Sequence, residues 1–100
     1  MDIKVCKYFI TLARAKSYAK AARELYLTTQ GLSTAIKRLE ASMGVPLISN
    51  ETGSLELTDY GKIFYHRART IQQEYEIMAD EIDALHRRRS GNISFAVSTG

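Results

Sequence analysis

Residues 17–40, SYAKAARELYLTTQGLSTAIKRLE, place apolar side chains at helical spacing on both sides of a short break. Ser17 is suited to cap a first short helix, and Leu27 closes the turn that follows. Thr28 or Thr29 can cap a second helix, whose inward residues recur at spacings of three, one and three: Leu32, Ala35, Ile36 and Leu39. The pattern predicts two helices that cross over a tight turn.

The contact positions of such a pair must hold small or well-shaped apolar groups. If Tyr18 is the first residue of a helix-turn-helix, these positions hold Ala21, Ala22, Leu25, Leu27, Leu32 and Ala35. The outward positions of the second helix hold short hydrogen-bonding side chains and then a cation: Thr29, Gln30, Ser33, Thr34 and Lys37. This face suits a helix in a DNA major groove. An ordinary helical hairpin with a polar solvent face is the alternative.

The segments around this pair extend the helical pattern. A first helix is expected from Ile3 to about Ala15, capped by Asp2, with an apolar stripe of Val5, Tyr8, Phe9, Leu12 and Ala13. After Glu40, Gly44 suits the left-handed residue that ends a helix, and Pro46 prevents its continuation.

Residues 47–57, LISNETGSLEL, have the composition of a small β-hairpin. Strands are expected at 47–48 and 55–57, with turn residues at 50–54. A lone two-stranded hairpin is marginal, so it must pack on the helices through Leu47, Leu55 and Leu57. Three helices and this hairpin predict a mainly α fold, a winged helix-turn-helix domain in residues 1–58.

A long helix is expected over residues 59–89, with Thr58 as its cap. Its apolar residues alternate at spacings of four and three: Phe64, Ala68, Ile71, Tyr75, Met78, Ile82 and Leu85. This seam is typical of a helix that pairs with another helix. The preceding domain is too small to cover a helix about 40 Å long, so a homodimer is expected through this seam. Core packing within one chain is the alternative.

The end of the chain changes character after this helix. Arg87, Arg88 and Arg89 complement the helix C-terminus, where cations are favoured. Residues 90–92 have the composition of a hinge, and residues 93–98 alternate like a strand. We therefore expect residues 90–100 to be a hinge and the first strand of a second domain that this chain lacks.

Charge is unevenly divided along the chain, which carries a net charge of +3. Residues 1–50 hold eight Lys or Arg and three Asp or Glu, whereas residues 51–100 hold six and eight. A basic half that coincides with the helix-turn-helix pattern favours a nucleic-acid partner over a scattered, solvated surface. No apolar run approaches the ~18 residues of a membrane span, so no membrane role is expected and the location should be cytoplasmic.

Candidate chemistry for catalysis is weak. His66 and His86 are twenty residues apart on the long helix, and Cys6, the one cysteine, has no spaced ligand partner. Cys6 is expected to be a small buried residue of the first helix. The sequence has no glycine-rich phosphate loop and no nucleophile–base pair, so we expect no enzyme, no metal and no cofactor.

Taken in order, five segments resemble the N-terminal part of LysR-type transcriptional regulators: MDIKVCKYFITLA, the helix-turn-helix stretch, MGVPLI, LELTDYGKIFYHRA and GNISFAVSTG. The resemblance implies a winged-helix domain that binds double-stranded DNA and a linker helix that pairs antiparallel with its mate. It also implies a missing effector domain that binds a small molecule and through which dimers can form tetramers.

The same resemblance assigns site residues. Thr28, Thr29, Gln30, Ser33 and Thr34 match positions that enter the major groove, and Ser17 and Lys37 match positions that touch or orient phosphate. The family usually has Gln and Pro where this chain has Thr29 and Gln30, so its preferred DNA sequence should differ.

The hairpin departs further from the family, which often carries Arg at the end of the first wing strand and at the wing tip. This chain has Asn50, Gly53 and Ser54 there, with Glu51 and Glu56 alongside. Loss of two phosphate contacts predicts weaker binding and a log–log salt slope shallower by about 1.8. A homodimerisation or protein-interaction module with weakened or lost DNA binding is therefore the alternative function.

Overall fold

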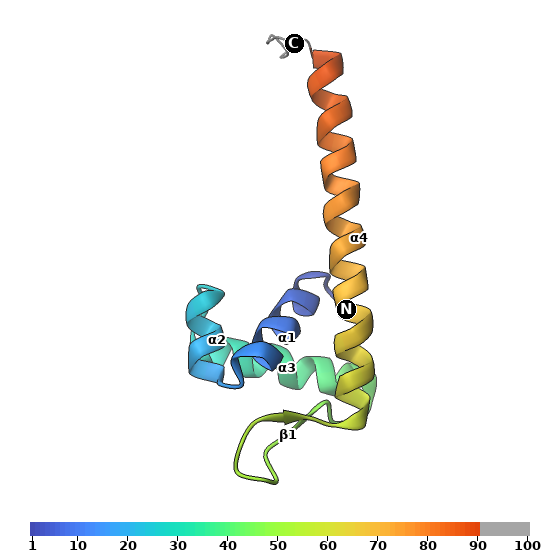
Figure 1. Ribbon diagram of the computed structural model, residues 1–100. Helices are drawn as coiled ribbons and strands as arrows, with labels where there is room; N and C mark the ends of the chain where they lie inside the picture. The colour runs from blue at the N-terminus through green and yellow to red at the C-terminus, as the bar shows by residue number, and fades with distance from the viewer. Residues whose placement is uncertain (91–100) are drawn as a thin grey trace.

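The structure, a computed structural model, describes residues 1–90 (Figure 1). Its elements are α1 (Lys4–Ala15), α2 (Tyr18–Glu24), α3 (Thr29–Met43), β1 (Ile48–Ser49), β2 (Glu56–Leu57) and α4 (Asp59–Ser90). The predicted strand at 93–98 lies outside the described residues. Ser90, expected to begin a hinge, is instead the last residue of α4.

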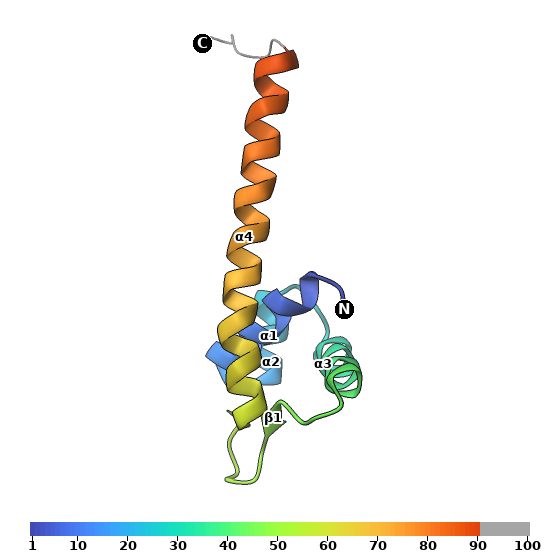
Figure 2. The same ribbon diagram turned by 90° about the vertical axis from the view of Figure 1, so that its right-hand side faces the viewer.

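The helix α1 is the centre of the compact part, because α2, α3 and α4 all pack against it (Figures 1 and 2). Phe9 and Leu12 of α1 are fully buried with Leu32 and Ile36 of α3, as their spacing predicts. A second cluster joins Cys6 and Ile10 to Ala68 of α4. Cys6 is thus a core residue as expected, whereas Ile10 was missing from the predicted stripe.

Backbone caps end the elements near the expected residues. Gly44 closes α3 with φ 77°, and the Thr58 hydroxyl accepts the Gly61 N–H (3.0 Å) at the start of α4. The predicted Asp2 cap is displaced by one residue. Ile3 is the N-cap of α1 without a side-chain bond, and Asp2 Oδ1 accepts the Lys4 N–H at 3.0 Å.

The hairpin is shorter than predicted. Its antiparallel strands pair Ile48 with Leu57 and Ser49 with Glu56. Leu47 and Leu55, expected inside the strands, lie just before them and are buried in the core. Leu47 and Leu55 therefore pack into the helical core instead of pairing in the strands, and they attach the hairpin to the helices.

The long helix α4 gives the molecule its shape. Its first turns pack on α1, and the rest extends away from the compact part, which makes the molecule 56 Å long and 24 by 18 Å across (Figure 2). Within residues 1–90, no helix combines the length and the apolar character that crossing a membrane would require.

Candidate nucleic-acid interface

The helix-turn-helix of α2 and α3 is fixed by two hydroxyl caps. Ser17 Oγ accepts the Lys20 N–H at 3.1 Å, and Thr28 Oγ1 accepts the Gly31 N–H at 2.9 Å. Both cap residues have extended backbone, as N-caps do. Ala21 and Ala22 are buried, which lets the two helices approach closely.

The turn between these helices contains a feature that the sequence did not indicate. Tyr26 has φ 58°, a left-handed conformation, and its side chain is 96% exposed. The Leu27 N–H then donates to the Ala22 carbonyl at 2.9 Å, which closes the turn. The left-handed residue allows the chain to reverse direction between α2 and α3.

The N-terminal half of α3 presents its predicted polar face to solvent. Thr28, Thr29, Gln30, Thr34 and Lys37 are exposed, whereas Ser33 and the cap Ser17 are half-buried. Two residues that the sequence interpretation left out belong to this region. Gly31 is exposed, and a Cβ there would lie 2.9 Å from Thr28 Oγ1, so glycine leaves room for the cap. Arg38 is exposed beside Lys37.

Glu40 joins α3 to the hairpin. Its Oε2 accepts the backbone N–H groups of Leu47 (2.7 Å) and Ile48 (3.0 Å). Burial raises the pKa of the nearby Tyr18 phenol, and the negative charge of Glu40 raises it further. Burial likewise raises the pKa of the Cys6 thiol.

The hairpin loop is polar and carries no positive charge. Residues 50–54 are exposed, and Gly53 adopts φ 87°. The Thr52 and Ser54 hydroxyls each donate to Glu56 Oε2 at 3.4 Å. Since the sequence has no Lys or Arg between Leu39 and Gly61, the polar side chains of this wing are hydrogen-bonding groups and carboxylates.

Comparison with known proteins identifies this architecture. Residues 3–62 match the sequence model of the bacterial regulatory helix-turn-helix proteins of the lysR family. The chain belongs to the LysR family. The predicted family and the predicted winged helix-turn-helix fold are both confirmed.

Similar proteins share this part of the LysR family. The uncharacterized HTH-type transcriptional regulator YybE of Bacillus subtilis is 39% identical over 94% of this chain, which spans 32% of that protein. The CbnR DNA-binding domain in its DNA complex is 32% identical, with a TM-score of 0.79 over 87% of this chain and 100% of that one. Vibrio fischeri DarR in complex with DNA is 30% identical, with a TM-score of 0.82 over 87% of this chain and 30% of that one. The chain therefore spans about a third of the length of most of the curated relatives it matches.

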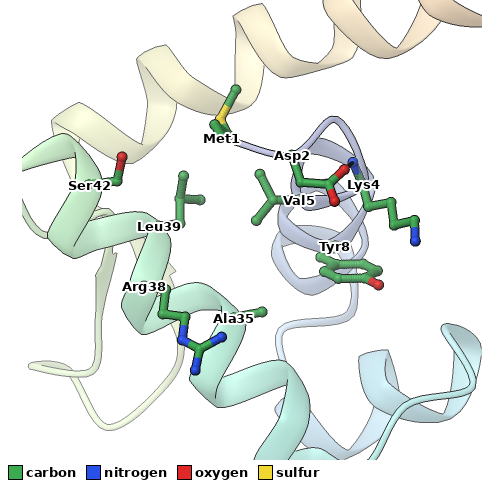
Figure 3. A pocket seen from close by; sticks show the side chains of 9 residues that line it. All are labelled: Met1, Asp2, Lys4, Val5, Tyr8, Ala35, Arg38, Leu39 and Ser42. Carbon is green, nitrogen blue, oxygen red and sulfur yellow. Dashed lines mark hydrogen bonds between the residues drawn. The ribbon is translucent and has the colours of Figure 1, made fainter.

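A hollow of about 480 Å³ lies between α1 and α3 of this LysR-family domain (Figure 3). Val5 and Leu39 face it from the two helices, and Lys4 and Arg38 lie at its margins. None of the residues predicted to contact DNA lines it. Arg38 is thus the point at which the polar face of α3 meets this hollow.

The predicted seam of α4 divides into two parts. Phe64 packs edge-to-face on Phe9, with ring centroids 4.9 Å apart, and Ala68 is buried against Cys6 and Ile10. These two residues contact their own chain because α1 lies over this end of α4. Ala68, 1% exposed, offers no surface to a partner, whereas Phe64 is half-buried. The remaining five, Ile71, Tyr75, Met78, Ile82 and Leu85, are 41% to 61% exposed.

Two further apolar residues at the base of α4 are exposed and were not predicted in the seam. Tyr60 is 53% exposed and Ile63 is 66% exposed. Their spacing matches the exposed residues farther along, so the exposed apolar stripe of α4 is Tyr60, Ile63, Ile71, Met78, Ile82 and Leu85, with Tyr75 at its edge. Within residues 1–90, no three His, Cys, Asp or Glu side chains gather as metal ligands would.

Proposed function

We propose that this chain is the DNA-binding part of a sequence-specific transcription regulator, with α3 as the helix that enters the major groove. The observation that carries the proposal is the exposed row of short hydrogen-bonding side chains on α3, inside a capped helix-turn-helix. Similar solved structures contain DNA. A bacterial regulator of this kind would act in the cytoplasm, as the sequence predicts.

Each side chain on this face has a chemical role available. The Gln30 amide can pair with the N6 and N7 atoms of adenine, and the threonines can bond a base edge or contact a thymine methyl. Ser17 and Thr28 already accept a backbone N–H through their hydroxyl oxygens. The hydroxyl proton of Ser17 therefore remains free to donate to a phosphate, and that of Thr28 to a base edge. Lys37, one helical turn beyond Thr34, can place its positive charge against the phosphate backbone.

Base-by-base binding assays test this assignment. Gln30→Ala and Thr34→Ala should change which bases are preferred, by about 1–3 kcal/mol at the affected position. Lys37→Ala should weaken binding to all duplexes about equally, because a phosphate contact carries no sequence information. Ser42→Ala, beside the α1–α3 hollow, is the matched control and should bind as the parent chain does. An unchanged base preference in Gln30→Ala would refute the groove assignment.

We infer that the regulator acts as a dimer whose two α3 helices enter successive major grooves. The exposed apolar stripe of α4 supports this inference, since seven large apolar side chains face solvent there. Residues 1–58 would bind DNA, residues 59–89 would pair the two copies, and residues 90–100 would lead into a C-terminal domain that binds a small-molecule effector. Dimers of the full-length chain could then associate into tetramers.

A second function, a homodimerisation module with weakened DNA binding, is favoured by the wing that lacks cations. Ile71→Glu with Met78→Glu should produce monomers in either case. DNA affinity should fall with the dimer only if the chain is a DNA-binding regulator. Equal, weak binding by dimer and monomer would support the interaction module instead.

A further inference from the structure

Charged residues interrupt the exposed apolar stripe of α4. Arg67 and Glu74 occupy stripe positions between Ile63, Ile71 and Met78, and Glu81 lies directly beside the stripe. All three charged side chains are exposed. The ion pairs found within residues 1–90 are Lys62–Asp59 and Arg87–Asp83, so none of these three has a charged partner in the described part of its chain.

These charges constrain whatever covers the stripe. A partner that buries Arg67 or Glu74 without pairing it must meet the cost of desolvating an isolated charge. The two residues are seven positions apart, about 10 Å along the helix axis, so they cannot pair within one helix. The covering surface must therefore offer carboxylates opposite Arg67 and remain compatible with Glu74.

Within the antiparallel pair of α4 helices that the family resemblance implies, we propose that the two-fold axis lies between Gln72 and Gln73 and that Arg67 lies between Glu74 and Glu81 of the partner subunit. This proposal rests on the homodimer inferred above. It sets Tyr60 opposite the partner's Leu85, Ile63 opposite the partner's Ile82, and Arg67 opposite the partner's Met78. The partner's Glu74 and Glu81 lie about one helical turn to either side of that methionine, within reach of a guanidinium.

Other arrangements of two copies leave Arg67 without a carboxylate partner. In the proposed register each Glu74 lies about one turn from the partner's Glu74, but the partner's Arg67 lies about one turn to its other side. A parallel pair would place Arg67 beside the partner's Arg67 and Glu74 beside the partner's Glu74, with no opposite charge within a turn along the stripe. An antiparallel pair centred on Met78, the middle of the exposed predicted seam, would place Arg67 opposite the partner's Arg89. That pair would also set Tyr60 and Ile63 beyond the partner's Ser90, the last described residue of its α4, although they are among the most exposed apolar residues of α4.

These three charged residues would consequently determine which helix can pair with α4. Apolar stripes on long helices are similar to one another, so apolar contact alone discriminates poorly between helices. Charges next to a helical seam determine partner choice and orientation, because a mismatched pair brings like charges together. Arg67, Glu74 and Glu81 would thus favour a second copy of this chain over the linker helix of another regulator.

A charge exchange tests the proposal. Arg67→Glu alone and Glu74→Arg with Glu81→Arg should each raise the homodimer dissociation constant at least about tenfold, since each variant faces its own charge across the interface. An equimolar mixture of the two variants should form a heterodimer, because both ends of the pair then match. Sedimentation velocity and co-purification of differently tagged chains measure both effects, and circular dichroism checks that each variant is helical.

Matched controls carry the same changes on the opposite side of α4. Lys62→Glu, and Glu76→Arg with Asp80→Arg, should dimerise as the parent chain does. If the mixture fails to restore a dimer, or if Arg67→Glu dimerises normally, the proposed register is refuted. If the register is refuted but Ile71→Glu with Met78→Glu still separates the subunits, the homodimer through α4 is retained. Failure of the register is thus distinguishable from failure of the homodimer.

Discussion

Tyr26 is held in a backbone conformation that its side chain disfavours. At φ 58° the Cβ atom approaches the following carbonyl oxygen, which costs roughly 1–2 kcal/mol for most L-residues and less for Asn. The phenol ring gains little packing in return, because 96% of the residue is exposed. The turn between α2 and α3 is therefore a place where stability can be added without touching the core.

We predict that Tyr26→Asn raises the free energy of unfolding by about 0.5–1 kcal/mol, because asparagine tolerates the left-handed region. Urea denaturation measures the change. Tyr26→Ala is the matched control: it removes the ring but keeps a Cβ atom, so it should give no such gain. Equal stabilisation by both variants would mean that the exposed ring, and not the backbone, is the unfavourable feature.

At the scale of elements, Glu40 is the polar link between α3 and the wing. One carboxylate oxygen holds two consecutive backbone N–H groups at the point where the chain enters β1. Without it, those two donors would be left partly buried and unpaired. The wing is thus fixed to α3 by one side chain and by the buried Leu47 and Leu55.

We predict that Glu40→Ala lowers the free energy of unfolding by about 1.5–3 kcal/mol, the range for hydrogen bonds to a charged group. Glu40→Gln should cost less, because the amide oxygen can still accept a bond. Glu24→Ala, at an exposed position, is the control and should change stability by less than about 0.5 kcal/mol. Urea denaturation separates these values, and equal losses for Ala and Gln would argue against the hydrogen-bonding role.

Capping residues and hydrophobic spacing predicted most of the helices and turns. The predictions that were wrong concern contacts between residues far apart in the sequence. Gly44, Thr58 and the Ser17 cap act within a few residues of their targets, so the sequence was sufficient for them. The Glu40 contacts cross seven and eight residues and depend on how the chain turns after Gly44. Heptad spacing likewise identified an apolar face of α4 but could not tell that α1 packs on Phe64 and Ala68 at one end of it.

At the scale of the whole molecule, the surface charge of α3 differs from that of the wing. The exposed face of α3 ends in Lys37 and Arg38, whereas the hairpin loop contains Glu51 and no cation. The polar face of α3 was predictable because it is contiguous in sequence. Exposed Tyr60 and Ile63 were not, since their exposure depends on which side of α4 the rest of the domain occupies.

We predict that Ser54→Arg at the wing tip steepens the log–log salt dependence of DNA binding by about 0.9, the value for one added phosphate contact. Fluorescence anisotropy on one duplex at several salt concentrations gives the slope. Thr70→Arg on α4, outside the helix-turn-helix, is the control with the same charge change and should leave the slope as it was. A slope unaltered by Ser54→Arg would place the wing away from the phosphates.

The continuity of α4 links the two ends of the molecule mechanically. The first turn of α4 packs tightly on the domain, since a Cβ atom at Gly61 would lie 2.0 Å from the Leu47 carbonyl oxygen. Ala68 is the last buried residue of α4. Beyond Ala68 the helix runs without a break for about 33 Å. Such a rod is a lever: a tilt of about 5° at the domain displaces its far end by about 3 Å. Conversely, a partner that holds the far end of α4 constrains the orientation of α3.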